Sequence, residues 1–297
     1  MAWKGLHLSQ AARLRLADGQ LVVERDGSLI RMPLEDIAYL MLDTPEASLS
    51  AALVSAMLNN GIVLIFTDQR HLPNGMALPF HSHHRQAGVA ALQQGVSVPL
   101  RKRLWQSLVV AKISNQSAVL DLTGQAGGEP LARMARLVGS GDPENVEARA
   151  AREYWKCLFT DFVRDDGGDY RNMCLNYGYA VMRAGLARAL TAYGLLPAFG
   201  LHHASVTNAF NLADDLIEPF RPFVDVAVWR LADAGHRREG EPSREDRQFL
   251  AGLPLCDALL GKETVGLLTA MDRVVASLVQ AMETGTAAVL LHPSLAP

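Results

Sequence analysis

The residues of this chain with the clearest capacity for chemistry lie between positions 202 and 218. His202, His203, Asp214, Asp215 and Glu218 fall within 17 residues of one another. The run 211–220 has a helical pattern, so Asp215 and Glu218, three positions apart, are expected to share one helix face. Two neighbouring carboxylates repel each other, and a bound cation would neutralise that repulsion. Carboxylates with an imidazole nearby suit a hard divalent cation, Mg²⁺ or Mn²⁺.

A third carboxylate, Glu147, lies in the helical segment ENVEARAAREYW (144–155), close to Arg149 and Arg152. A solvated helix face with paired charges would explain this segment equally well if it stood alone. Its alanines, however, allow close approach, and basic residues beside a metal-bound carboxylate suit a site that handles phosphate. The three carboxylates together favour a metal-dependent phosphoryl-transfer enzyme.

The two histidines follow a sharp break in the helical pattern that contains Gly194, Pro197 and Gly200. They are therefore expected in a loop between helices, from which an imidazole can be aimed at a metal. A single histidine in a loop is more often a polar surface residue, but here two of them precede an acidic pair. The residues themselves do not choose between His202 and His203.

Composition restricts the class of protein. The chain has 297 residues, 49% of them hydrophobic, which is ample for one or two folded domains. The formal net charge of −3 excludes a strongly basic protein, so any contact with nucleic acid must come from local patches. Three widely spaced cysteines indicate neither a disulfide framework nor a zinc site. Without a signal-peptide pattern or a long apolar run, we expect a cytoplasmic protein that does not enter a membrane.

The pattern of elements changes once along the chain. Alternating apolar runs separated by Asp18-Gly19 and Asp26-Gly27 predict hairpins and a small N-terminal β domain over residues 1–75. A stretch rich in Pro, Gly and His predicts a linker at 76–86. Helical patterns follow, among them 207–218 and 263–283, and predict an α-helical catalytic domain over 87–297 that ends in a loose tail. The expected fold class is therefore α+β, with a small β-rich domain before a larger all-α domain.

Basic residues that could contact the DNA backbone occur in several places. The candidate groups are Arg101, Lys102 and Arg103 with Trp105; Arg183 with Arg188; and Arg237 and Arg238 with Arg244 and Arg247. Each group alone is more often a solvated face, and only the neighbouring phosphoryl-transfer residues favour a role in DNA binding. The linker histidines His81, His83 and His84 fit no zinc motif.

Five segments together resemble one protein family. They are PLEDIAYLMLD (33–43), IVLIFTDQRHLPNGMALPFHSHHR (62–85), ENVEARAAREYW (144–155), LNYGYAVMRAGLARAL (175–190) and GLHHASVTNAFNLADDLIEPFRPFVD (200–225). The chain resembles the CRISPR adaptation integrases, the larger of the two universal spacer-acquisition proteins, and most closely their compact type II form. The resemblance implies an N-terminal β domain and a helical C-terminal domain, in agreement with the pattern of elements.

The resemblance also implies a ligand set for Mg²⁺ or Mn²⁺. It maps Glu147, His203 and Glu218 onto the family's metal ligands, and Asp215 onto a neighbouring acid of the same site. His203 is preferred to His202 because its separation from Glu218 is the one typical of the family. Ala148 stands where many members carry glycine, a small change beside the first ligand.

By resemblance, the 3′-hydroxyl ends of a short DNA duplex would attack phosphodiesters at the borders of a CRISPR repeat. The β domain would form a homodimer, and the dimers would flank a small ferredoxin-like adaptation partner. Two other functions remain open at this point. One is a stand-alone, structure-specific DNA repair nuclease that needs no partner, and the other is a catalytically inactive scaffold that binds DNA or the partner.

Overall fold

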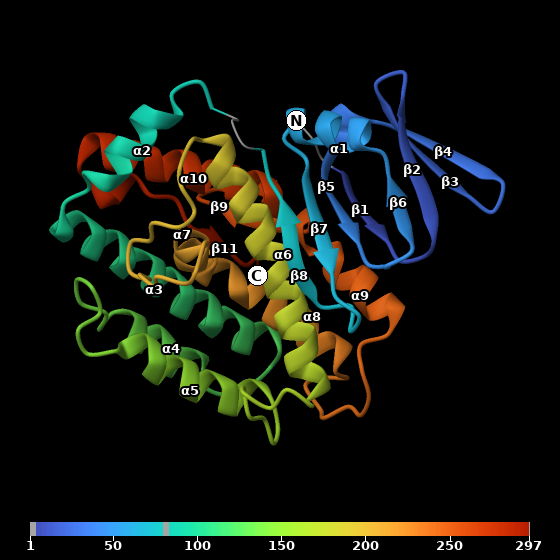
Figure 1. Cartoon of the computed structure of the whole chain (residues 1–297). Coiled ribbons are helices and arrows are strands. Elements are labelled where there is room, and N and C mark those ends of the chain that lie inside the picture. The colour runs from blue at the N-terminus through green and yellow to red at the C-terminus, as the bar shows by residue number, and fades with distance from the viewer. Residues whose placement is uncertain (1–3, 80–82, 297) are drawn as a thin grey trace.

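The computed structural model of the chain describes residues 4–79 and 83–296. Strands gather in the N-terminal part, and helices make up most of the remainder (Figure 1). The predicted class, a β-rich region followed by a larger helical region, is confirmed. Within the described residues, no helix has the length and apolar character needed to cross a membrane.

Two four-stranded sheets and one helix form the β-rich region. The first sheet has the order β1 (Lys4–Leu8), β5 (Ile37–Leu42), β7 (Val63–Thr67) and β8 (Pro73–Ala77). The second has the order β4 (Ser28–Pro33), β3 (Gln20–Arg25), β2 (Ala12–Ala17) and β6 (Ala47–Leu49), and the helix is α1 (Ala51–Asn59). A 3₁₀ turn at Leu34–Asp36 precedes β5.

The two predicted hairpins join β2 to β3 and β3 to β4. Asp18 and Gly19 have φ angles of 52° and 70°, and Asp26 and Gly27 have φ angles of 48° and 76°. Two consecutive positive φ angles are what a two-residue type I′ turn requires, and Asp-Gly adopts them at low cost. These turns were correctly predicted because their conformation depends on neighbouring residues alone.

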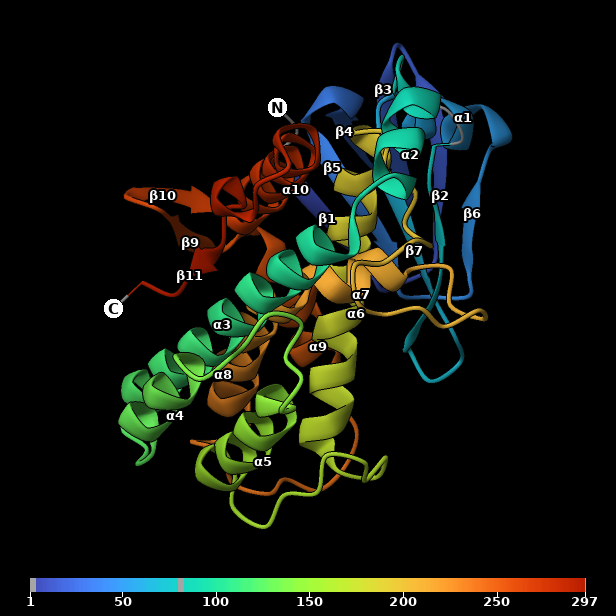
Figure 2. The same cartoon turned by 90° about the vertical axis from the view of Figure 1, so that its left-hand side faces the viewer.

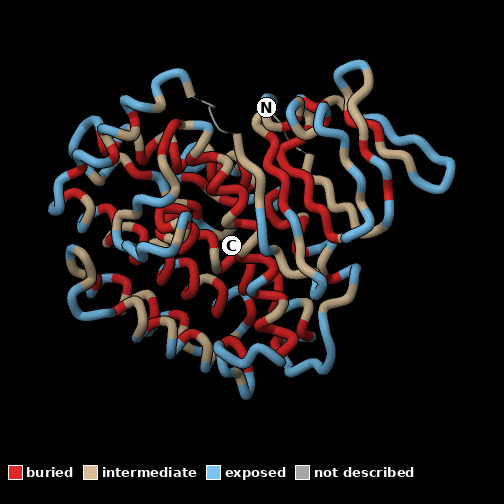
Figure 3. The backbone as a smooth tube through the Cα atoms, viewed as in Figure 1, coloured by how far each residue is buried: buried red, intermediate tan, exposed pale blue. Residues whose placement is uncertain are grey.

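The central strands of the first sheet, β5 and most of β7, are covered on both faces (Figure 3). Leu40 and Leu64 belong to a core shared with the second sheet and α1. Tyr39, Met41 and Val63 belong instead to the main core, which is built mostly from helices. Since successive side chains of a strand point to opposite faces, this sheet connects the β-rich region to the helical region.

The helical region contains nine helices within the described residues. They are α2 (Gln86–Gln94), α3 (Val98–Leu122), α4 (Gly128–Ala135), α5 (Val146–Leu158), α6 (Tyr170–Ala192), α7 (Asn211–Leu216), α8 (Arg221–Leu231), α9 (Arg244–Ala251) and α10 (Leu267–Thr284). Three further 3₁₀ turns are Glu218–Phe220, Leu253–Leu255 and Ala287–Val289. Helix α6 is buried on nearly all sides and runs through the centre of the molecule (Figures 1 and 3).

The segment expected to be a linker is only partly outside regular structure. Met76 and Ala77 belong to β8, which pairs with β7. Residue Gln86 begins α2. Residues 80–82, with His81, lie outside the described residues.

A third, small sheet interrupts the helical region, which the sequence pattern did not predict. It consists of β9 (Asp257–Leu260) with β10 (Glu263–Gly266) and β11 (Pro293–Ser294) on either side, close to α10 (Figure 2). The helix expected from 263 therefore begins only at Leu267. The end of the chain is not a loose tail, because β11 pairs with β9 and the Asn115 side chain donates to the carbonyl of Pro293 (2.9 Å). Short apolar runs of this kind cannot be assigned to strand or helix by periodicity alone.

Candidate active site

Glu147 is positioned by the start of α5. The two carboxylate oxygens of Asp142 accept hydrogen bonds from the backbone N–H groups of Val146 (2.9 Å) and Glu147 (3.0 Å). These are amides at a helix N-terminus, which have no partner inside the helix, so Asp142 determines where α5 begins. Glu147 lies in the first turn, where the helix dipole favours a carboxylate.

Glu218 does not lie in the same helix as Asp215, contrary to the expected continuous helix. Helix α7 ends at Leu216, and Glu218 begins a 3₁₀ turn that contains Pro219. The Glu218 side chain is only 6% exposed, and the Arg221 Nε–H donates to its Oε1 (2.8 Å). After the change of helix type, the Glu218 carboxylate contacts Lys112 of α3, whereas Asp215 bonds with the His203 loop.

Lys112 of α3 brings Glu147 and Glu218 together. Its ammonium donates to Oε1 of Glu147 (2.5 Å) and forms an ion pair with Oε2 of Glu218. The two glutamates are 71 positions apart in the sequence, yet they share one buried cation. The sequence reasoning did not identify Lys112. Its only signal is a single lysine in the apolar helical run VVAKI, since lysine is almost never fully buried unless it is paired.

The charges of this cluster are strongly coupled. Burial would raise the pKa of Glu218, but Arg221 and Lys112 outweigh it and lower that pKa to about 2. Burial would lower the pKa of Lys112, but Glu218 and Glu147 outweigh it and raise that pKa above its ordinary value. Glu218 and Lys112 are therefore both ionised at neutral pH.

Asp215 organises the loop that carries the histidines. Its buried carboxylate accepts hydrogen bonds from the backbone N–H groups of Leu201 (2.5 Å), His202 (3.1 Å) and His203 (3.1 Å). It also accepts from Nδ1 of His203 (2.7 Å). A side chain at Gly200 would place its Cβ 2.3 Å from the His203 carbonyl oxygen, so this close turn requires glycine. Asp215 thus holds the ring of His203 and leaves Nε2 as the nitrogen that can coordinate a metal.

The two histidines pack against Trp105 in different ways. The His202 ring stacks on Trp105, with centroids 4.3 Å apart and an interplanar angle of 3°. His203 meets Trp105 edge-on, at 5.7 Å and 86°. Trp105 is buried beneath both rings and is not part of an exposed basic patch. Only the His203 ring is bonded to Asp215, which distinguishes two histidines that the sequence could not separate.

The pKa of His203 is raised above its ordinary value. The first cause is the hydrogen bond to Asp215, and the nearby carboxylates of Glu218 and Asp214 add to it. Asp214 itself does not join the cluster, because it forms an ion pair with Arg183 (2.7 Å). Glu218 therefore favours the protonated form of this imidazole.

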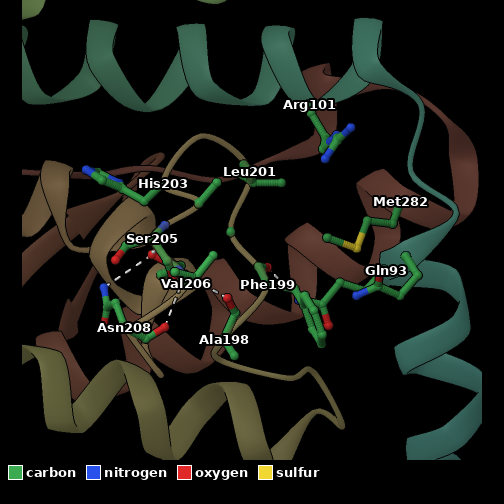
Figure 4. Close-up of a pocket in the computed structure, with 14 residues that line it drawn as sticks. Gln93, Arg101, Ala198, Phe199, Leu201, His203, Ser205, Val206, Asn208 and Met282 are labelled. Carbon is green, nitrogen blue, oxygen red and sulfur yellow. Dashed lines mark hydrogen bonds between the residues drawn. The ribbon is translucent and has the colours of Figure 1, made fainter.

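A cavity of about 340 Å³ opens beside His203 (Figure 4). Its lining includes Arg101 at the start of α3, together with Phe199 and Val206 from the loop around the histidines. Phe199 and Val206 are exposed apolar side chains. The cavity therefore combines one basic group with apolar surface immediately next to the candidate site.

Most of the other candidate DNA-contacting arginines have partners within the protein. Arg188 pairs with Asp272 (3.1 Å), Arg238 with Asp246 (3.7 Å), Arg247 with Asp43 (2.8 Å), Arg237 with Glu239 (4.0 Å), and Arg244 donates to Ser9 (2.7 Å). Arg101–Arg103 also lies beside the site, with Lys102 and Arg103 exposed on α3.

The donor set fits a hard divalent cation. As they stand, no three His, Cys, Asp or Glu side chains in the described parts of the chain are close enough to hold a metal ion. The reason is visible at Glu147 and Glu218, where the Lys112 ammonium lies between the carboxylates. Oε2 of Glu218 is buried, and its partner is the Lys112 ammonium, so a cation already lies at this oxygen. Two carboxylates and one imidazole are ligands that Mg²⁺ or Mn²⁺ accepts.

Comparison with known proteins agrees across sequence and structure. The family model described as CRISPR associated protein Cas1 matches residues 6–250. The CRISPR-associated endonuclease Cas1 of Neisseria meningitidis serogroup C (strain 8013) is 39% identical over 299 aligned residues, which cover 100% of this chain and 98% of that protein.

Two solved structures share the fold. A casposase bound to integration product has a TM-score of 0.77 at 18% identity, covering 96% of this chain and 92% of that chain. A Cas6-RT-Cas1–Cas2 complex has a TM-score of 0.73 at 16% identity, covering 97% of this chain and 36% of the longer chain. The length of the sequence match and the identity to the Neisseria protein establish that this chain belongs to the Cas1 family of CRISPR-associated proteins.

Proposed function

We propose that this chain is a metal-dependent DNA integrase and endonuclease of CRISPR adaptation, of the compact type II form. It would join the 3′-hydroxyl ends of a short DNA duplex to phosphodiesters at the borders of a CRISPR repeat. One observation carries the proposal: Glu147 and Glu218, far apart in the sequence, converge on a single buried cation position. The names of the similar proteins, an endonuclease and a casposase bound to integration product, support the same chemistry.

The proposed metal is Mg²⁺ or Mn²⁺, held by Glu147, His203 and Glu218. When bound, it would act as a Lewis acid at the scissile phosphate and stabilise the negative charge that develops there. Asp215, first expected among the ligands, would belong to the site by fixing the His203 ring, because both its oxygens accept hydrogen bonds. Arg221 keeps Glu218 ionised and in place.

The proposed macromolecular substrates are double-stranded DNAs, the prespacer and the CRISPR repeat. Exposed basic residues flank the site on two helices: Arg149 and Arg152 on α5, and Lys102 and Arg103 on α3. Such residues can contact phosphates without reading sequence. They would complement the cavity beside His203.

The proposed assembly is a cytoplasmic complex of homodimers with a small ferredoxin-like adaptation partner. The solved Cas6-RT-Cas1–Cas2 complex, which shares this fold, supports a partner by its composition. For the homodimer, the relevant surface is β4, an edge strand of the second sheet on which Leu29 and Ile30 are exposed. An exposed apolar edge strand is a surface on which another chain can pair.

The proposal can be tested with a short duplex bearing free 3′-hydroxyls and a supercoiled plasmid bearing a leader and repeat. These are mixed with Mn²⁺, the small partner, and either wild-type protein or Glu218→Ala. Wild-type product at the repeat border, absent with the variant, is the expected result. Glu263→Ala is the matched control, because Glu263 also pairs with an arginine but is exposed and distant from the site.

Two results would contradict integration and favour the alternatives. Nicking that needs no partner and ignores the repeat would identify a repair nuclease. Wild-type protein that binds DNA but yields no product, with or without the partner, would identify a scaffold.

A further inference from the structure

The cation between Glu147 and Glu218 in this structure is a side chain of the protein. The Lys112 side chain is 10% exposed, and its ammonium contacts one oxygen of each carboxylate. Two carboxylates this close would repel each other without an intervening charge. An ammonium buried among helices also requires carboxylate partners, because an unpaired buried charge is strongly destabilising. The three groups therefore stabilise one another in the absence of metal.

A divalent ion that bridges Glu147 and Glu218 would occupy the position of this ammonium. Both cations need the same carboxylate oxygens, and two positive charges in one small buried space repel each other. Metal binding therefore requires that the Lys112 ammonium moves.

The structure contains a place for the displaced ammonium. A cavity of about 220 Å³ lies next to Glu218 and is lined by Lys112, Gln116 and Asp225, among others. Gln116 is one helical turn beyond Lys112 on α3, and residues four apart share a helix face. Its Oε1 is buried and has no hydrogen-bond partner among the described residues. An unsatisfied buried acceptor is costly, and a lysine ammonium would satisfy it.

We propose that Lys112 is an internal cation that occupies the metal position in the metal-free protein, and that the divalent ion displaces it toward Gln116. This inference rests on the proposed metal-dependent function. Lys112 is then a positioning residue: it holds Glu147 and Glu218 in place before metal binds, and its competition sets the metal affinity.

The test measures Mn²⁺ affinity by isothermal titration calorimetry and thermal unfolding with and without Mn²⁺, at about pH 8. Lys112→Met removes the competing charge. It should bind Mn²⁺ about tenfold more tightly than wild type, a change of about 1.4 kcal/mol. It should also unfold at lower temperature without metal and gain more stability from Mn²⁺ than wild type does.

Two further variants test the proposal even if Lys112→Met fails to fold. Gln116→Leu removes the acceptor for the displaced ammonium but leaves the Lys112 pairs intact, so it should weaken Mn²⁺ binding without lowering metal-free stability. Lys156→Met is the matched control, because Lys156 pairs with Glu153 (3.0 Å) on the exposed face of α5. It should change neither quantity.

The outcomes separate this inference from the proposed function. Wild-type protein that binds no Mn²⁺ would overturn both. If Glu218→Gln loses Mn²⁺ binding while Lys112→Met binds Mn²⁺ as wild type does or more weakly, the proposed displacement of Lys112 is wrong. The proposed metal-dependent function would still stand. Tighter binding by Lys112→Met together with weaker binding by Gln116→Leu would support it.

Discussion

Asp215, Glu218 and Asp225 are three buried carboxylates within 11 residues, and each has different partners. Asp215 accepts from backbone amides and His203, and Glu218 pairs with Arg221 and Lys112. Among the described residues, the hydrogen-bond donors to Asp225 are two neutral hydroxyls, those of Tyr154 and Tyr179. The partners, and not the residue type, decide what each carboxylate does: orient a ring, bind a cation, or anchor the tyrosines of the core.

Asp215→Asn should disrupt the site through His203. The amide cannot accept all the hydrogen bonds that Asp215 accepts, so the loop and the ring orientation are lost. Loss of such an orienting partner weakens metal affinity by about 10–100-fold, and calorimetric titration with Mn²⁺ would measure it. Asp214→Asn is the matched control, since the neighbouring Asp214 pairs with Arg183 and should leave Mn²⁺ affinity unchanged. Equal affinities for both variants would contradict the role of Asp215.

Asp225 should make folding stability depend on pH. Burial raises its pKa from 3.8 to about 6, although the Tyr179 and Tyr154 hydroxyls both donate to it. Because the folded pKa is the higher one, its stabilising contribution is present below about pH 4 and is lost as the pH rises through about 6. Relative to wild type, Asp225→Asn should therefore gain unfolding free energy between about pH 4 and pH 7, by about 3 kcal/mol at most.

Urea unfolding at several pH values would measure this gain. Asp26→Asn, in an exposed hairpin turn, should give a curve parallel to that of wild type. A curve for Asp225→Asn that is also parallel to wild type would show that the buried carboxyl does not titrate in this range.

At the scale of elements, the site depends on where helices begin and end. Helix α5 starts at the point where Asp142 caps it, α7 stops before Glu218, and the 3₁₀ turn with Pro219 changes the direction of that side chain. A continuous helix would have kept Asp215 and Glu218 on one face. The interruption instead lets one carboxylate serve the histidine loop and the other face α3.

Asp142→Gly should therefore affect both stability and the site. Glycine tolerates the left-handed backbone at this position (φ 48°), so the variant removes the cap without adding strain. The free energy of unfolding should fall by about 1 kcal/mol, and Mn²⁺ affinity should fall with it as the first turn carrying Glu147 frays. Ser243→Ala removes the cap of α9, far from the site, and should cost similar stability with no change in Mn²⁺ affinity. If Asp142→Gly binds Mn²⁺ as tightly as wild type does, the cap formed by Asp142 does not position Glu147 for metal binding.

At the scale of the molecule, the β-rich and helical regions are joined by polar contacts as well as by the shared core. Asp43, at the end of β5, is fully buried and bonds to His7 (2.9 Å), His71 (2.7 Å) and Arg247 of α9 (2.8 Å). The Tyr39 hydroxyl donates to the carbonyl of Ala251 at the end of the same helix (2.5 Å). These contacts hold the first sheet against α9 of the helical region.

Arg247→Met should destabilise the whole protein. It leaves the buried Asp43 carboxylate without its permanent cation, and removing one partner of a buried pair costs about 3 kcal/mol or more. Chemical denaturation would measure this loss, and hydrogen exchange should increase along β5 and β7. Arg31→Met is the control, because the Arg31–Asp18 pair is exposed and contributes little. If the two variants lose equal stability, the junction does not depend on Asp43.

Features that depend on near neighbours in the chain could be predicted from the sequence. The Asp-Gly turns predicted the β2–β3 and β3–β4 hairpins, because two adjacent residues set those backbone angles. The residue types of Glu147, Glu218 and a histidine at 202 or 203 predicted a cation-binding cluster, because ligand chemistry is a property of the side chains themselves, and the choice of His203 came from the family resemblance.

Which of these groups come into contact depends on the three-dimensional fold. Three features depend on packing between distant segments. Glu147 and Glu218 share the Lys112 ammonium, Asp215 bonds to the histidine loop, and β11 completes a third sheet. Burial removes water as a partner, so each buried charge must find an opposite charge or a hydrogen bond wherever the fold brings one near. A local sequence pattern shows which residues are charged but not which partners they meet in the fold. The partner determines the role of each charged residue.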